Sequence, residues 1–281
     1  MKNNLRIALL VIIATFIVAG AQAQRQKVIY LQKYNNEPYH FGFLLGVNFM
    51  DYSLHTVENY QNEIHRKSQF SHQIEDVTGF QDAQFDHFQI INAESRTTPG
   101  FSVGVIGDKR LGDYFNLRIC PTLSLSSKYV YYEALLYDSD NNIIAKKLIV
   151  GDDDYSVKSN DQLATFLEMP ILIKYRSKRY NNIGAYLIAG VNPKLYLASR
   201  KTKINADGHP ALLQTNRTDL ALEIGAGFDI YNQWFKMGVE IKMSFGLINV
   251  LKTDSLSMDY IYNIPFNDVR NKQLQLSFTF E

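Results

Sequence analysis

The chain has 281 residues, with 29 basic and 28 acidic side chains, so it offers no basic surface of the kind that binds nucleic acid. Its single cysteine, Cys120, cannot form an internal disulfide bond. There are 18 Tyr and 17 Phe residues against 1 Trp. Enrichment in Tyr fits the aromatic girdles of a membrane barrel, but it fits any other β-rich protein as well.

Residues 1–23 have the three parts of a secretory signal peptide. Lys2 and Arg6 form a basic start, residues 7–19 form an apolar run, and a small-x-small cleavage signal ends at Ala23. The alternative, a membrane anchor, is disfavoured because a spanning helix needs roughly 20 apolar residues. No cysteine lies near the cut, which argues against a lipoprotein. We expect cleavage, which removes two basic residues and leaves 27 against 28 acidic ones, a net charge of −1.

A polar leader at residues 24–39 precedes eight stretches in which apolar side chains alternate with polar or small ones. Side chains of a β-strand alternate between its two faces, so this pattern predicts strands. Pro121 has no N–H to donate, so we expect a bulge or a broken ladder there. The predicted strands are residues 40–52, 100–110, 115–132, 165–176, 183–198, 220–231, 234–250 and 274–281.

The connections between these strands alternate between long and short. The long connections are residues 53–99, 133–161, 199–216 and 251–271. We expect the first to be a large loop that contains a short helix or ribbon, and the second to contain a hairpin that turns at residues 138–142. Long loops outside the cell and short periplasmic turns are typical of outer-membrane barrels.

Alternation alone does not say which face of a strand points inward. A soluble lipocalin-like barrel would enclose its apolar face around a ligand, whereas a membrane barrel turns that face to lipid. Three features favour the membrane. The first two are that both ends of the barrel lie on the short-turn side, and that the last strand alternates Leu and Phe as an outer-membrane assembly signal does. The third feature is the set of charges on the mixed faces: Arg118, Glu168, Lys174, Arg176, Lys194, Glu223, Asp229, Lys236, Glu240 and Lys242.

Each Arg or Lys in the middle of a lipid-facing wall would cost roughly 2–4 kcal/mol, so these charges belong in the interior, or lumen. We therefore predict an all-β fold: an eight-stranded antiparallel transmembrane β-barrel over residues 40–281, in the bacterial outer membrane after Sec-type export. An eight-stranded barrel is just wide enough to be filled by its own side chains. We expect paired charges to close the lumen, with Arg118 and Glu168 as one pair, so that the barrel is not a pore.

No catalytic, metal-binding or cofactor-binding pattern is found. His55, His65, His72, Asp76, Asp86 and His87 lack a recognised ligand spacing. Residues 151–154 are acidic but lack the alternating ligands and distal Glu of an EF-hand. There is no G-x-S-x-G motif, and His40 and His209 are isolated. We therefore expect a protein that is not an enzyme, has no cofactor, and binds neither nucleic acid nor a small-molecule substrate.

Three strand motifs resemble the PorT-like outer-membrane β-barrel family of Bacteroidetes. They are FGFLLGVN at residues 41–48, NLRICPTLS at 116–124 and FLEMPILIKY at 166–175. The last pattern is shared by many barrels of that phylum, and the first two carry the closer match. The resemblance covers essentially the mature chain.

The resemblance implies an accessory, non-conduit role in the type IX protein secretion system, which in some species supports gliding. Its partners would then be other type IX components and outer-membrane lipid. The family has no agreed catalytic residues. Two other interpretations stay open: a general outer-membrane barrel that serves as adhesin, receptor or structural protein, and a soluble ligand-binding barrel.

Overall fold

The computed structural model describes residues 28–69, 85–148, 162–197, 213, 215–252 and 263–281. The predicted signal peptide lies outside these residues, as do His72, Asp76, His209 and the acidic stretch 151–154. The described part contains 13 strands and short 3-10 turns. No helix within it is long and apolar enough to cross a membrane.

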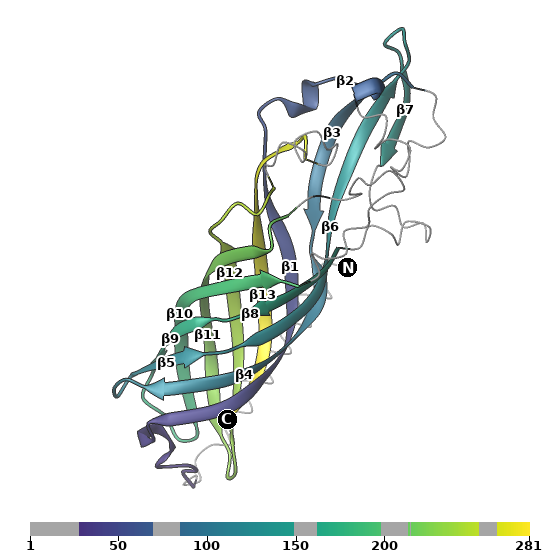
Figure 1. The fold of residues 1–281 in the computed structure, drawn as a ribbon. Helices are drawn as coiled ribbons and strands as arrows, with labels where there is room; N and C mark the ends of the chain where they lie inside the picture. Colours follow the sequence, from purple (N-terminus) through teal and green to yellow (C-terminus); the bar gives the residue numbers. More distant parts are fainter. Residues whose placement is uncertain (1–27, 70–84, 149–161, 198–212, 214, 253–262) are drawn as a thin grey trace, which may run out of the picture.

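Ten of the strands pair in antiparallel fashion into a closed ring (Figure 1). β1 lies between β13 and β4, and the pairing of β10 with β11 completes the circuit. β5 and β6 together lie between β4 and the consecutive strands β8 and β9, so each consecutive pair acts as one interrupted strand. When each interrupted pair is counted as one strand of the wall, the ring has eight wall strands, which we call staves. This confirms the predicted barrel. The ring strands are β1 (Tyr39–Thr56), β4 (Thr98–Arg110), β5 (Phe115–Ile119), β6 (Thr122–Tyr137), β8 (Gln162–Glu168), β9 (Ile171–Arg176), β10 (Ile183–Tyr196), β11 (Thr218–Tyr231), β12 (Lys236–Gly246) and β13 (Phe266–Phe280).

Both interruptions lie at prolines. Pro121 separates β5 from β6, and Pro170 separates β8 from β9. A proline cannot donate to the ladder, but its carbonyl still accepts. The Pro121 carbonyl takes the Val105 N–H at 3.0 Å, and the Pro170 carbonyl takes the Cys120 N–H at 3.1 Å. The break predicted at Pro121 is confirmed, and the wall stays hydrogen-bonded across it.

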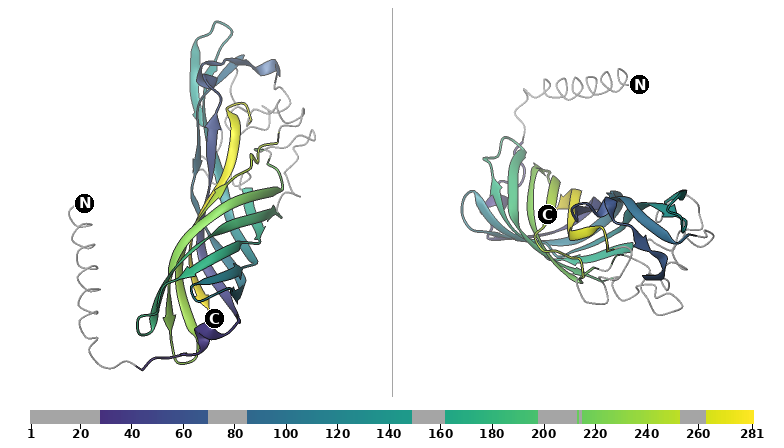
Figure 2. Two further views of the ribbon diagram at one scale, coloured as in Figure 1. Left: turned by 90° about the vertical axis from the view of Figure 1, so that its left-hand side faces the viewer. Right: turned by 90° about the horizontal axis from the view of Figure 1, so that it is seen from above.

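Three further strands extend the barrel beyond one end of the ring. These are β2 (His65–Arg66), β3 (His87–Arg96) and β7 (Ile143–Leu148). β3 and β7 pair with the far half of β6, and β2 pairs with β3. Figures 1 and 2 show β3, β6 and β7 rising well above the ring. We call this part the extension and its side the loop end. The short turns 111–114, 177–182 and 232–235 lie at the opposite side, the turn end.

The extension confirms one prediction and corrects two. The hairpin at residues 138–142 is confirmed, since β6 and β7 pair across it. The assignment of residues 53–99 to a loop is wrong in part, because β3 and the start of β4 lie there. A register shift between Ile90 and Asn92 breaks the alternation that would have marked β3 as a strand. The last strand likewise begins at Phe266, inside the predicted loop 251–271.

The wall of the ring has the opposite polarity to a soluble protein. Phe41 on its outer face is 75% exposed, whereas Arg118 and Lys174 on its inner face are 1% and 0% exposed. In water this arrangement would bury charge and solvate apolar groups, and in lipid it does the reverse. The exposed aromatics Tyr39, Tyr114, Tyr175, Tyr180 and Trp234 gather at the turn end, as interfacial girdles do. The soluble-barrel interpretation is therefore wrong.

The polarity of both faces reverses at one height near the loop end. On the outer face of β1, Phe49 is followed by the polar Asp51, and their partners on β13 are Leu274 and Lys272. On the inner face of β6, Lys128 is followed by the apolar Val130. This level marks the edge of the lipid layer. Below it, residues 39–49 of β1 have the length of about 9–11 residues that a tilted strand needs to cross a bilayer.

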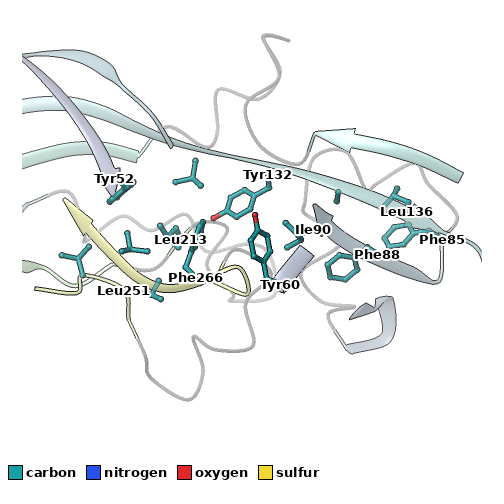
Figure 3. Packing of buried hydrophobic residues seen from close by; sticks show 14 residues of the cluster. Tyr52, Tyr60, Phe85, Phe88, Ile90, Tyr132, Leu136, Leu213, Leu251 and Phe266 are labelled. Atoms are coloured by element: carbon teal, nitrogen blue, oxygen red, sulfur yellow. The ribbon is translucent and has the colours of Figure 1, made fainter. Parts of the chain in front are cut away.

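Above that level, the extension has its own apolar core. Figure 3 shows Tyr132 of β6 beside Phe266 of β13 and Tyr60, with Phe88 and Leu136 further along. The rings of Tyr132 and Phe266 lie 5.8 Å apart. Leu213, Val250 and Leu251 belong to the same cluster. The extension is therefore a packed body and not a set of loose loops.

The reversal predicts opposite responses to charge along β1. Val47→Arg places a guanidinium on the lipid-facing wall and should lower the free energy of unfolding by about 2–4 kcal/mol. His55→Arg, on the outer face above the reversal and beside Asp268, should change it by less than about 1 kcal/mol. Urea titration in lipid vesicles measures both. Equal losses would contradict the assigned lipid edge.

Candidate functional site

The lumen is crossed near the turn end by the Arg118 side chain of β5. Its guanidinium contacts three carboxylates: Asp108 on β4 at 3.1 Å, Glu240 on β12 at 3.1 Å and Glu281 at 2.8 Å. The Tyr186 hydroxyl donates to Glu240 at 2.9 Å. Because β5 and β12 are separated by three strands of the ring on either side, the Arg118–Glu240 pair joins opposite walls, whereas Asp108 lies beside Arg118 on the neighbouring strand. We call this group the Arg118 clamp.

A second group of charges lies beside the clamp. Lys174 Nζ lies 2.8 Å from Asp229 Oδ2, and Lys236 Nζ lies 2.7 Å from Glu281 Oε2. Glu281 therefore serves both Arg118 and Lys236 with its two oxygens. The Lys174 ammonium also lies 3.8 Å from the centre of the Tyr186 ring, a cation–π distance. Each buried cation here has both a carboxylate and an aromatic neighbour.

A third layer lies nearer the loop end. Lys194 contacts Glu168 at 3.8 Å and donates to Gln273 of β13 at 2.6 Å. Asn192 donates to both Glu168 and Glu223, at 2.8 and 2.6 Å, and Glu223 pairs with Lys242 at 3.3 Å. Above it, Lys128 donates to Asn271. The Lys194–Gln273 and Lys128–Asn271 contacts reach across the lumen, and the others join neighbouring strands, so buried side chains meet inside it at several heights.

All ten charges singled out in the sequence are buried. Among the described residues, nine of the ten have an oppositely charged group within 4.0 Å, and Arg176 has none. The predicted Arg118–Glu168 pair is wrong: β5 stands opposite β9, so Arg118 faces Leu172, while Glu168 faces Thr122 and Lys194. The register is the same on both sides of the break at Pro121, and it places Arg118 four residues away from Thr122, the residue that faces Glu168.

Sequence reasoning missed four charged members of the lumen: Asp108, Lys128, Asp219 and Glu281. Asp108 and Lys128 continue the inner faces of their predicted strands, and Glu281 ends the polar face of the last one. The alternation could have found them. Small residues also matter on this side: a Cβ on Gly46 would lie 2.9 Å from the Leu276 carbonyl. Large charged side chains and glycines thus share the crowded interior.

The turn end of the lumen is covered by the segment before β1. The Tyr34 hydroxyl donates to Glu281 at 3.2 Å, and its ring stacks on His40 at 4.2 Å. Burial, and then the negative charge of Glu281, raises the pKa of Tyr34, so the hydroxyl stays protonated and can donate. Asn35 accepts from Arg176 at 3.0 Å and from Tyr231 at 2.9 Å. We call the surface around this cover the turn-end mouth.

Neither a metal centre nor a catalytic arrangement is found within the described residues. No group of three His, Cys, Asp or Glu side chains there could hold a metal ion. His40 lies 2.7 Å from the Tyr34 carbonyl and stacks on that ring, which is a structural role. His55 and His65 lie near single carboxylates, Asp268 and Glu63.

A closed antiparallel ring with an apolar outer wall and a charged, filled lumen defines a transmembrane β-barrel of the outer-membrane type. The comparison with protein families agrees with this assignment. Residues 21–252 match the family described as "Outer membrane protein beta-barrel domain". The chain belongs to this family, and the protein is a bacterial outer-membrane β-barrel. The turn end is then periplasmic and the extension extracellular.

Solved outer-membrane proteins show weak likeness to the chain. Neisserial surface protein A is 12% identical over 86% of this chain and 98% of its own, with a TM-score of 0.38. OprG from Pseudomonas aeruginosa is 11% identical over 85% and 94%, with a TM-score of 0.32. Ail of Yersinia pestis is 8% identical over 87% and 98%, with a TM-score of 0.32. No curated protein matches the chain.

The Arg118 clamp should dominate the stability of the barrel. Arg118→Met leaves the buried carboxylates of Asp108 and Glu240 without an ion-pair partner and Glu281 with Lys236 alone, and we expect a loss of about 3–5 kcal/mol in the free energy of unfolding. Arg96→Met, which removes the solvent-exposed partner of Glu94, should cost less than about 1 kcal/mol. Urea titration in vesicles compares the two. A loss below about 1 kcal/mol for Arg118→Met would contradict the claim that the clamp dominates the stability of the barrel.

The cross-lumen contacts also predict the electrical behaviour of the barrel. Because charged side chains meet across the interior, we expect no continuous water path, and the purified protein in planar bilayers should show no stable conductance. Arg118→Ala combined with Tyr186→Ala removes the largest cross-lumen side chains of the clamp and serves as the comparison. Stable channels from the wild-type protein would contradict a closed lumen.

Proposed function

We propose that this protein is a non-catalytic recognition barrel of the outer membrane, which acts as an adhesin or receptor through its extension. The observation that carries the proposal is the packed body above the lipid edge. β1, β6 and β13 continue past that edge and join β3 and β7 around a shared apolar core. A rigid body of this kind holds a binding surface in a fixed shape, which lowers the entropy lost on binding.

The outer surface of the extension has the composition of an interaction surface. The Arg96 guanidinium lies 4.1 Å from the centre of the Tyr131 ring, and Lys146 pairs with Glu133 at 3.0 Å. The hairpin exposes Ile143 and Ile144 side by side. Aromatic residues and Arg, with apolar groups inside a polar rim, are enriched at protein interfaces. The lumen charges would support this surface by fixing the staves below it.

The second candidate is the accessory role in type IX secretion. It is supported by the strand motifs at residues 41–48, 116–124 and 166–175, which resemble the PorT-like family. The contact with other type IX components would then involve the periplasmic turns, where Trp234 and Tyr180 are strongly exposed. The two candidates place the working surface at opposite ends of the barrel.

A site-specific crosslinking experiment separates the two candidates. A photoreactive residue replaces Ile144 in the hairpin or Trp234 in the periplasmic turn, each in a deletion strain that also carries a reporter with a C-terminal secretion signal. Recognition predicts adducts at position 144 and normal secretion in the deletion strain. The accessory role predicts adducts at position 234 and reporter trapped in the periplasm. Trapped reporter without adducts at position 144 would overturn the recognition proposal.

A further inference from the structure

The periplasmic mouth carries positive charge that the protein does not balance. Among the described residues, Arg176, Lys178 and Arg179 have no carboxylate within 4.0 Å, in contrast to the charges deeper in the lumen. The nearby Asp113 pairs with Arg110 at 2.7 Å, and Asp229 pairs with Lys174. Arg179 instead donates to backbone carbonyls and stacks 3.9 Å from the Tyr231 ring. Three cations thus lie around one small region that Asp113 and Asp229 also line, and neither carboxylate forms an ion pair with any of the three.

These cations line a polar cavity of 290 Å³ at the rim. Arg176 is buried, and its Nε has no hydrogen-bond partner among the described groups, although its other nitrogens bond to Asn35 and Asp113. Asp229 lines the same cavity, and its Oδ1 also lacks a partner. Unpaired buried polar groups cost free energy, so a ligand that offers both an acceptor and a donor would relieve two of them.

An apolar groove lies next to this cavity on the lipid-facing wall. It has a volume of 540 Å³ and lies across β9, β10, β11 and β12. Its floor is formed where small residues, Ala189 and Ala226, stand between larger ones. The groove reaches Tyr175 and Leu187, which are cross-strand partners. Two residues further toward the periplasm on the same outer face, Ser177 and Ala185 line the polar cavity.

The order of these two hollows matches the order of groups in a membrane lipid. A basic cavity lies at the level of the headgroups, and an apolar groove continues from it toward the middle of the bilayer. We propose that this rim is a binding site for one glycerophospholipid of the periplasmic leaflet. Its phosphate lies against Arg176 and Lys178, a headgroup hydroxyl or ammonium faces Asp229, and one acyl chain occupies the groove.

The site has a mechanical consequence for the turn-end mouth. Arg176 holds Asn35 of the covering segment, and Arg179 holds the carbonyls of Tyr30 and Leu31. A phosphate bound against Arg176 would fix this guanidinium and, through Asn35, the cover. The inference does not depend on which of the two proposed functions holds, since it concerns the barrel wall and not the partner.

Lipid retention by the full-length protein in detergent tests this proposal. The protein is loaded with phosphatidylglycerol or phosphatidylethanolamine, and native mass spectrometry counts the lipid that stays bound. Lys178→Glu reverses a charge at the cavity, and Lys109→Glu makes the same change on β4 outside it. Ala226→Phe fills the groove, and Val191→Phe adds a Phe to the wall outside the residues that line it. Heat-modifiability gels verify that each variant is folded.

We expect one tightly held phospholipid on the wild-type protein, with retention reduced at least tenfold by Lys178→Glu and by Ala226→Phe, and unchanged by their two controls. Three results would overturn the proposal. If diacylglycerol is retained to the same extent as phosphatidylglycerol, the site does not recognise the phosphate. If glycerol 3-phosphate competes as strongly as the whole lipid, the groove does not contribute to binding, and the cavity is a site for free phosphate. Equal loss from Lys178→Glu and Lys109→Glu would indicate a general effect of charge.

Discussion

The Arg118 clamp is the interaction on which the rest of the barrel depends. A guanidinium removed from water is tolerable only when carboxylates and hydrogen bonds surround it. Here Asp108, Glu240 and Glu281 supply that compensation from other parts of the ring. Satisfying this one cation therefore fixes the distance between opposite walls and the register of the last strand. The same contacts place buried side chains across the lumen at this height.

The second constraint is the reversal of polarity at the loop end. Below that level lipid surrounds the wall, so apolar groups point outward and charges inward. Above it water surrounds the wall, so the same strands point Val130, Tyr132 and Val269 inward. One continuous sheet is thus compatible with both lipid and water, because its apolar side chains face outward below this level and inward above it. The exchange lets a membrane anchor and an extracellular body share strands, with no flexible linker between them.

The turn end works differently, because its charges are not all paired. Tyr34 and Asn35 cover the mouth, but they leave the guanidinium of Arg176 without a carboxylate. Most lumen charges have an ion-pair partner among the described residues, whereas Arg176, Lys178 and Arg179 at the rim have none, and this points to different roles: support in one case, contact with an outside anion in the other. The polar cavity lies at the rim and the apolar groove lies next to it on β9 and β10, so the two follow each other along the bilayer normal.

The sequence by itself determined the class of fold. Alternation over residues 165–176 and seven other stretches gave the staves, and the cost of charge in lipid decided which face is inside. It did not reveal β3, because the bulge at Ile90 and Asn92 disrupts the period of two. Nor did it give the ion pairs: Arg118 was expected opposite Glu168, whereas it bonds to residues 10, 122 and 163 positions away. Period and composition are local properties of the chain, but partners across a lumen depend on the register between strands, on shear and on ring closure. Only the tertiary structure sets these, because they arise from pairing between strands.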